Sequence, residues 1–320
     1  MGANNRILLI VLVLTVIGLP MYLETDSYWI TVFIIAGIYS IVAIGLSLLI
    51  GYAGQISLGH GAFFGLGAYT SGLLTTKLAV NPWLALGIAL LFTASVALLI
   101  GIPTLRLSGH YLAMATLAIG EIIAITATAE VELTGGSSGF GEIPALSICG
   151  FELDPLMELR YYGFVWTVVV IVLILSLNLI HSRIGRALRS IHGSELAANA
   201  MGVNTAYYKI QVFVLSAALA SLAGSLYAHY VTFVSPTSCE IKFSVLLMVM
   251  VAVGGMKNVW GGLVGAVLLT ILPEHLTIFE DYDILLYGLI LMGIMIFLRD
   301  GLVGAIASMG HRIGKLARAK

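Results

Sequence analysis

The feature that most constrains this chain is how few charges it carries. Of its 320 residues, 60% are hydrophobic and only 10% are charged, whereas soluble proteins carry about 25% charged residues. Most of its surface must therefore face hydrocarbon, which excludes a soluble enzyme, a nucleic-acid-binding protein and a disordered protein. The 36 glycines agree, because membrane helices use glycine where two backbones approach closely. We predict an all-α, polytopic integral membrane bundle forming one transmembrane domain over residues 1–320.

Apolar runs long enough to cross a bilayer recur along the whole sequence. A hydrocarbon core of about 30 Å needs about 20 apolar residues per helix. We predict about ten such helices, or eight if the short eighth and ninth runs form a broken or re-entrant pair. The predicted helices cover residues 7–23, 28–50, 59–78, 83–102, 109–129, 162–181, 210–233, 243–256, 260–274 and 284–299.

The basic residues predict the orientation, because Lys and Arg collect on the cytoplasmic side of a membrane. With the N-terminus inside, twelve of the fifteen basic residues fall in inner segments, and both termini are cytoplasmic. The first run is then a retained anchor, and residues 306–320 form a basic cytoplasmic tail. The inner residues are Arg6, Arg106, Arg183, Arg186, Arg189, Lys209, Lys257, Arg299, Arg312, Lys315, Arg318 and Lys320, and the outer ones are Lys77, Arg160 and Lys242.

Two cysteines, Cys149 and Cys239, fall in predicted outer loops. In an oxidising periplasm they could form a disulfide, and two unconnected thiols are the alternative. The sequence contains no CxxC motif and no His/Cys cluster, so we predict no metal site.

The helical pattern breaks at residues 51–57. Gly51 and Gly54 make this stretch too rich in glycine for a stable helix, and Gln55 and Ser57 add polar side chains. Non-helical backbone in a membrane must be satisfied by protein or by a water-filled cavity, and such breaks occur near substrate pathways. These residues either line a translocation pathway or form a tight turn without a ligand. A fainter break follows at 254–262.

Small residues at helical spacing predict faces on which helices pack closely. Gly61 and Gly65 belong to the first face, and they too are candidates for either the pathway or packing. The full sets are Gly61, Gly65, Ala68 and Gly72 in the first face, Ser216, Ala220, Gly224 and Ala228 in the second, and Gly261 and Gly265 in the third.

Two titratable residues in the predicted spans are candidates for a functional role. His60 is predicted to be a hydrogen-bonded structural histidine, with a proton carrier or a metal ligand as the alternative. Glu121 is the one acid placed within a span, where a charge costs a few kcal/mol. We therefore expect Glu121 to face the bundle interior with a partner, or to be protonated. It either lines the pathway or ties helices together.

The polar segment 183–209 contains a short predicted helix. Ser194 can cap it, Glu195 is favourable at its positive end, and Gly202 suits its left-handed stop. Roughly seven residues make a helix only about 10 Å long, which is too short to be stable alone. Its alanines make a flat surface, so we expect the helix to dock on another protein; a solvated loop helix is the alternative.

This segment resembles the EAA-type coupling segment of ABC importer permeases, with Glu195, Ala197, Ala198 and Gly202 as its acid, alanines and glycine. Nearly the whole chain is similar to the permease subunits of branched-chain amino-acid ABC importers, of the LivM-like type. The similar blocks are GYAGQISLGHGAFFGLGAYT at 51–70, YLAMATLA at 111–118, TGGSSG at 134–139, the coupling segment at 183–209 and VGGMKNVWGGLVGA at 253–266.

The resemblance implies a half-channel in the inner membrane, paired with a second permease subunit. Two ATPase subunits would bind ATP and Mg on the cytoplasmic face, and a periplasmic binding protein would deliver substrate. The segment 183–209 would couple to the ATPase. This chain would bind no cofactor itself, in keeping with the absence of a phosphate-binding GxxxxGK[ST] motif. Leucine, isoleucine and valine are the expected substrates, with urea, amides or other amino acids as alternatives.

Two other functions fit the sequence less well. An ion-coupled secondary transporter usually needs several ionisable groups within the membrane, and Glu121 is essentially the one present. A membrane-embedded enzyme needs catalytic groups that meet in the bundle, whereas the seven histidines are scattered along the chain.

Overall fold

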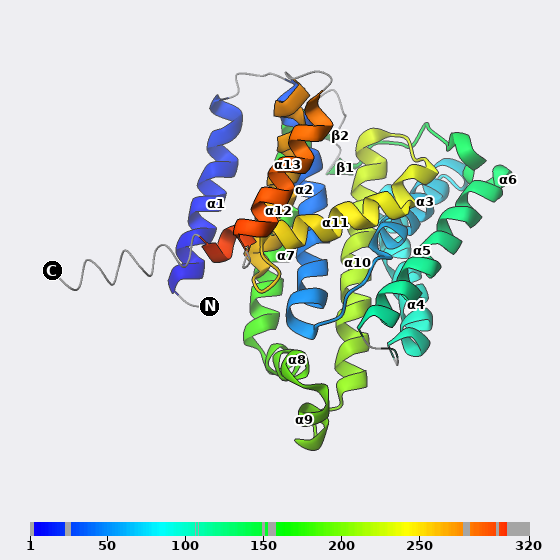
Figure 1. Cartoon of the computed structure of the whole chain (residues 1–320). Helices are drawn as coiled ribbons and strands as arrows, with labels where there is room; N and C mark the ends of the chain where they lie inside the picture. Colours follow the sequence, from blue (N-terminus) through cyan, green and yellow to red (C-terminus); the bar gives the residue numbers. More distant parts are fainter. Residues whose placement is uncertain are drawn as a thin grey trace.

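The computed structural model describes residues 3–22, 27–105, 107, 109–148, 151–152, 158–277, 282–298 and 301–305. These residues form a bundle of helices (Figure 1). Arg106, Cys149 and the tail 306–320 lie outside the described residues, so the predictions made for them have no structural counterpart.

The long helices follow the predicted runs in order. They are α1 (Ala3–Tyr22), α2 (Ser27–Ser47), α3 (His60–Lys77), α4 (Pro82–Thr104), α5 (His110–Ala129), α7 (Glu158–His181), α10 (Thr205–Val231), α11 (Ile241–Gly254), α12 (Val259–Leu276) and α13 (Asp283–Phe297). The short elements are η1 (Leu48–Tyr52), α6 (Val131–Thr134), η2 (Gly136–Ser138), β1 (Ser147–Ile148), β2 (Phe151–Glu152), α8 (Arg183–Gly193), α9 (Glu195–Ala200) and η4 (Pro236–Cys239).

Six helices in the described part of the chain are long and apolar enough to cross a membrane: α2 with its extension η1, α4, α5, α7, α10 and α12. The predicted short eighth run is the 14-residue helix α11. At about 1.5 Å per residue it is about 21 Å long, less than the thickness of a hydrocarbon core. It crosses the bundle at an angle to α2 and α10 (Figure 1). The predicted ninth run is longer than expected, because α12 has 18 residues.

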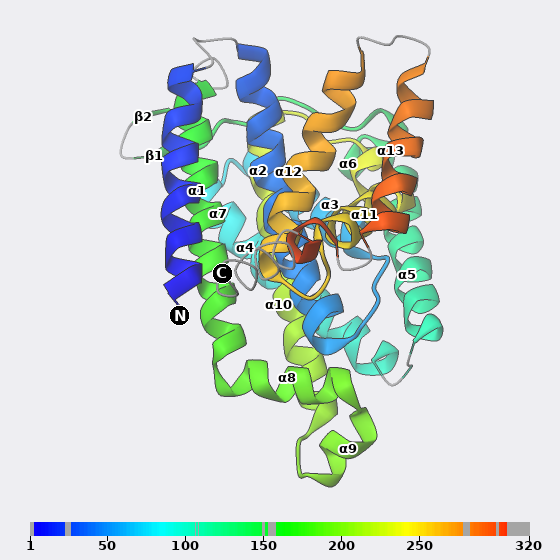
Figure 2. The ribbon, with the colours of Figure 1, turned by 60° about the vertical axis from the view of Figure 1, so that its left-hand side comes forward.

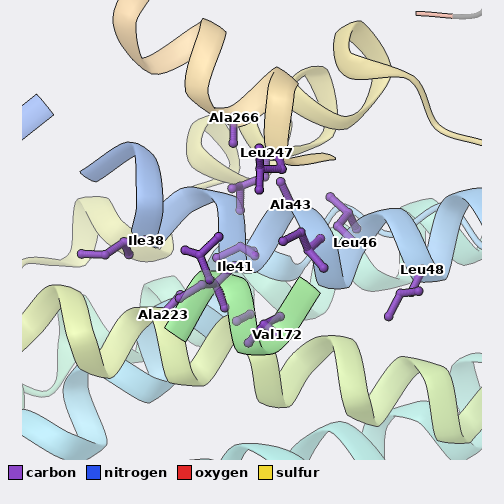
Figure 3. Close-up of a cluster of buried hydrophobic side chains, with 14 of the residues drawn as sticks. Ile38, Ile41, Ala43, Leu46, Leu48, Val172, Ala223, Leu247 and Ala266 are labelled. Atoms are coloured by element: carbon purple, nitrogen blue, oxygen red, sulfur yellow. The ribbon is translucent and has the colours of Figure 1, made fainter. Parts of the chain in front are cut away.

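Helix α2 forms the centre of the bundle, beside α12 and α7 (Figure 2). Its residues are apolar on every side, which is the pattern of a helix that is buried all round. Side chains from four other helices surround it (Figure 3). Ile38, Ile41, Ala43 and Leu46 of α2 lie near Val172 of α7, Ala223 of α10, Leu247 of α11 and Ala266 of α12.

Helices α3 and α10 pack with their backbones almost in contact. A Cβ atom added to Gly224 of α10 would lie 1.9 Å from the carbonyl oxygen of Phe64, and one added to Gly67 of α3 would lie 2.3 Å from that of Ser221. The predicted small-residue face around Gly224 is therefore a packing face, and its partner is α3. Such close approach also lets α10 donate a hydrogen bond from Ser225 to the carbonyl oxygen of Gly67, at 3.1 Å.

The other two predicted faces pack as well. Gly65 of α3 lies against Cys239, whose Sγ atom would be 1.9 Å from an added Cβ atom, and Gly61 lies against Ser244 at the start of α11. Gly265 of α12 lies against the carbonyl oxygen of Met250 in α11. The first face therefore holds η4 and α11, and the third joins α11 to α12.

The packing of α10 on α3 generates a stability prediction. In Gly224→Ala the new methyl group would overlap the Phe64 carbonyl, and we expect the free energy of unfolding to fall by about 1–3 kcal/mol. Thermal unfolding of the purified protein in detergent measures this loss. Gly163→Ala is the matched control, because Gly163 has open space around its Cα atom. Equal melting temperatures for the two variants would contradict the packing argument.

Candidate functional site

An amphipathic helix, α8, joins the end of α7 to the predicted short helix. Ser182 caps it by accepting a hydrogen bond from the backbone N–H of Ile184, at 3.1 Å. Leu188 and Ile191 are buried against the bundle, and α8 lies across the end of the bundle (Figure 2). Helix α8 was not predicted, although Ser182 and the spacing of Ile184, Leu188 and Ile191 are signals for a capped amphipathic helix.

Helix α9 forms where the sequence predicts it. Ser194 caps it by accepting from the backbone N–H of Ala197, at 3.3 Å, and Gly202 adopts φ of +82° just after its end. The helix projects beyond the ends of the neighbouring helices (Figures 1 and 2). Ala198 packs inward, whereas Leu196 and Met201 are 85% and 84% exposed. These two large apolar side chains are therefore accessible from outside the chain at this end of the bundle.

Glu195 fastens α9 to the first turns of α10. Its carboxylate pairs with the ammonium group of Lys209 at 2.5 Å, and the Thr205 hydroxyl lies 3.3 Å from it. The same hydroxyl lies 3.1 Å from the side-chain oxygen of Asn199. The Lys209 side chain is only 7% exposed, whereas that of Glu195 is 41% exposed. Glu195 is thus turned toward its own chain, so it positions α9 and leaves the outward surface to Leu196.

The predicted break after α2 is present, and it contacts two other parts of the chain. The helix widens into the π-helical turn η1 and then becomes irregular. A Cβ atom on Gly51 would lie 1.7 Å from the carbonyl oxygen of Met256, so this break packs against the turn after α11. Gly54 has φ of +68° and lies against the ring of His192, which belongs to α8. The two glycine-rich breaks therefore meet, and one of them touches α8.

His60 is the hydrogen-bonded structural histidine that the sequence predicts. It is fully buried, with Nδ1 3.0 Å from the Ser57 hydroxyl and Nε2 2.7 Å from the Ser216 hydroxyl. It therefore ties the break to α10. Gln55 is also buried, and its side-chain amide has no hydrogen-bond partner among the described residues.

Glu121 does not face the interior of this chain, contrary to the expectation. The inward face of α5 is formed mainly by small residues; a Cβ atom added to Gly120, for example, would lie 3.4 Å from the Cα atom of Gly59. Glu121 lies beside this face and is half-buried in a groove of about 500 Å³ that also contains Glu240 and Lys242. Among the described residues no hydrogen bond or ion pair reaches its carboxylate.

Among the described residues, no three His, Cys, Asp or Glu side chains are grouped so that they could hold a metal ion. Cys239 is a free thiol in η4. Burial, and then the nearby charge of Glu240, raises the pKa of this thiol to about 12. Its possible partner Cys149 lies outside the described residues, so the disulfide stays a prediction.

Comparisons with known proteins identify the family of the chain. Residues 28–298 match the family described as the branched-chain amino acid transport system permease component. The chain is 32% identical to the high-affinity branched-chain amino acid transport system permease protein LivM of Escherichia coli strain K12, over 83% of this chain and 68% of that protein. It is 24% identical to a probable LivM of Methanocaldococcus jannaschii, over 83% and 90% of the two chains.

The high-affinity permease protein LivH of Escherichia coli strain K12 is also 24% identical, over 83% of this chain and 91% of that one. No solved structure gives a significant match. The family match over most of the chain, together with the LivM similarity, shows that this protein belongs to the branched-chain amino acid transport permeases, of the LivM type.

Proposed function

We propose that this chain is a permease subunit of an ATP-driven importer of leucine, isoleucine and valine in the inner membrane. Its partners would be a second permease subunit, two ATP-binding subunits that hold ATP and Mg, and a periplasmic substrate-binding protein. The observation that carries the proposal is α9, which projects from a membrane bundle and exposes Leu196 and Met201. Family membership supports the transport of branched-chain amino acids.

The distribution of charge supports a cytoplasmic position for α9. Helices α8 and α9 lie at one end of the bundle (Figures 1 and 2). Helices α1 and α10 start at this same end, and helices α4 and α7 finish there. Most of the described basic residues lie there, and Lys and Arg mark the cytoplasmic side. The residues at this end are Arg6, Arg183, Arg186, Arg189 and Lys209. The same charge distribution supports a cytoplasmic N-terminus at the start of α1.

Two contacts support a coupling role for the unit formed by α8 and α9. Lys209 joins α9 to α10, and the contact of His192 with Gly54 joins α8 to the break after α2. A nucleotide-driven movement of an ATPase subunit bound to α9 would therefore reach both a long helix and an irregular segment. Because α8 and α9 are connected to the rest of the chain at these two points, a rigid-body displacement of the unit would move both α10 and the break, with no change inside α9 itself.

The outward face of α5 supports a second permease subunit. Only a third of the apolar window in α5 is buried in this chain, and Glu121 lies on its outward face. A carboxylate facing hydrocarbon costs about 2.5–3.5 kcal/mol on insertion scales. A partner helix bundle with a water-filled path between the two subunits removes that cost. Similarity to both LivM and LivH agrees with such a pair.

Reconstitution tests the function as a whole. The complete assembly is placed in liposomes with a loaded binding protein, and uptake of labelled leucine, isoleucine, valine, urea and short amides is measured. We expect ATP-dependent uptake of the three amino acids. Uptake by this chain alone in response to an ion gradient, or ATP-dependent uptake of urea alone, would overturn the proposal.

The exposed apolar surface of α9 generates a prediction about assembly. We expect Leu196→Asp to reduce co-purification of the ATP-binding subunits strongly, because a carboxylate would be desolvated in the docking surface. Leu78→Asp is the control, since Leu78 is a 68% exposed leucine at the opposite end of the bundle. Unchanged co-purification in Leu196→Asp would show that α9 is not the docking element.

The ion pair of α9 generates a second prediction. Glu195→Gln leaves Lys209 charged and nearly buried, so we expect the attachment of α9 to α10 to weaken by roughly 1–2 kcal/mol. This loss is smaller than for a fully buried ion pair, because the Glu195 side chain is 41% exposed. Lys209→Met should have a smaller effect, since Glu195 can turn to water. Amide hydrogen exchange of residues 195–200 measures both, with Arg186→Gln as the control. A larger effect in Lys209→Met would contradict the assignment.

A further inference from the structure

The groove that contains Glu121 has two walls of different character. One wall is a single face of α5, formed by Glu121, Ile125 and Thr128 at helical spacing. The other is the start of α11, with Glu240, Ile241 and Lys242. At about 500 Å³ its volume lies within the range of small-molecule sites.

The charged groups of the groove have no partners of their own. Among the described residues, neither an ion pair nor a side-chain hydrogen bond involves Glu121, Glu240 or Lys242. The first backbone N–H groups of α11, at Ile241 and Lys242, also lack acceptors, because the first bonds that return to Glu240 come from Phe243 and Ser244. The groove therefore presents an unpaired carboxylate on the α5 wall, and an unpaired carboxylate together with unpaired donors on the α11 wall.

This arrangement is complementary to the zwitterion of an α-amino acid. The Lys242 ammonium group and the positive N-terminal end of α11 suit a carboxylate. The carboxylates of Glu121 and Glu240 suit an α-ammonium group. Ile125 and Ile241 supply apolar surface for an aliphatic side chain. In membrane transporters, helix N-termini inside the membrane recognise anionic substrate groups by the same physics.

We propose that this groove is a transit site for the branched-chain amino acid zwitterion, with Lys242 and the start of α11 holding its carboxylate and Glu121 with Glu240 holding its ammonium group. This inference rests on the proposed function and adds the place and chemistry of substrate contact. The second permease subunit closes the open side of the groove and separates the charges from lipid.

Substrate protection of a cysteine placed in the groove tests the site directly. Thr128 is exposed on the α5 wall, so Thr128→Cys reports access to the groove. The complete permease–ATPase complex in detergent, without binding protein, is treated with a charged maleimide, and alkylation of this chain is read by intact mass. We expect millimolar leucine to slow alkylation. Leucinamide lacks the carboxylate and 4-methylpentanoate lacks the ammonium group, so neither should protect.

The two native cysteines should not contribute to the measured alkylation in this experiment. Cys149 is removed as Cys149→Ser. Cys239 is 2% exposed and its thiol pKa is raised to about 12, so it stays unreactive toward maleimide at neutral pH. Leu133→Cys, at an exposed leucine of α6, is the control position that leucine should not protect. Equal alkylation of Thr128→Cys with and without leucine overturns the proposal, and so does equal protection by all three compounds.

Uptake by the reconstituted assembly separates this inference from the proposed function. We expect Lys242→Gln and Glu121→Gln to lower leucine uptake about ten- to a hundredfold, as loss of a charged contact implies. Lys242→Arg should retain most of the uptake, and Glu130→Gln, an exposed acid beyond the groove, should retain all of it. Wild-type uptake in Lys242→Gln and Glu121→Gln overturns the transit site, whereas absent ATP-driven uptake in the wild type overturns the proposed function itself.

Discussion

Backbone contact between α3 and α10 is the interaction on which the rest of the structure depends. Lipid tails are as apolar as leucine, so burial of apolar surface does not drive helices together inside a membrane, and close packing must do so. Gly224 and Gly67 allow each helix to touch a carbonyl group of the other. Once the backbones are this close, Ser225 can reach Gly67, and Ser71 can reach His229 at 2.8 Å. Glycine thus makes room for the polar contacts that specify one register.

The position of α10 connects the two candidate sites. Its first turns hold α9 through Lys209, and its middle reaches the break through Ser216 and His60. Its far end leads through η4 into α11, where the groove begins. A single 27-residue helix therefore begins at the surface where we propose that ATPase subunits dock, and its other end is connected through η4 to the α11 wall of the proposed transit site. Coupling over such a distance needs a stiff element, and a helix held by backbone contact provides one.

Some of this architecture was predictable because it follows from local chemistry. The apolar runs gave the order of the long helices, and the cap at Ser194 with the stop at Gly202 placed α9. The small-residue faces were predictable as packing faces, because their spacing alone creates a flat surface. Their partners were not: no local signal in α3 indicates that Gly61 and Gly65 face α11 and η4 while Gly67 faces α10. Helix α8 was not predicted, although its signals, the cap at Ser182 and the amphipathic spacing, are local.

By itself the sequence determined that the chain is a helical membrane protein, and it located the helix α9, because hydropathy and capping act over a few residues. Only the tertiary structure decided the environments of the acids. Glu195 faces inward to Lys209, fourteen residues away, and Glu121 faces outward into a groove shared with α11, more than a hundred residues away. Which way a charged side chain points depends on which face of its helix the neighbouring helices occupy, and that is settled only when distant segments pack.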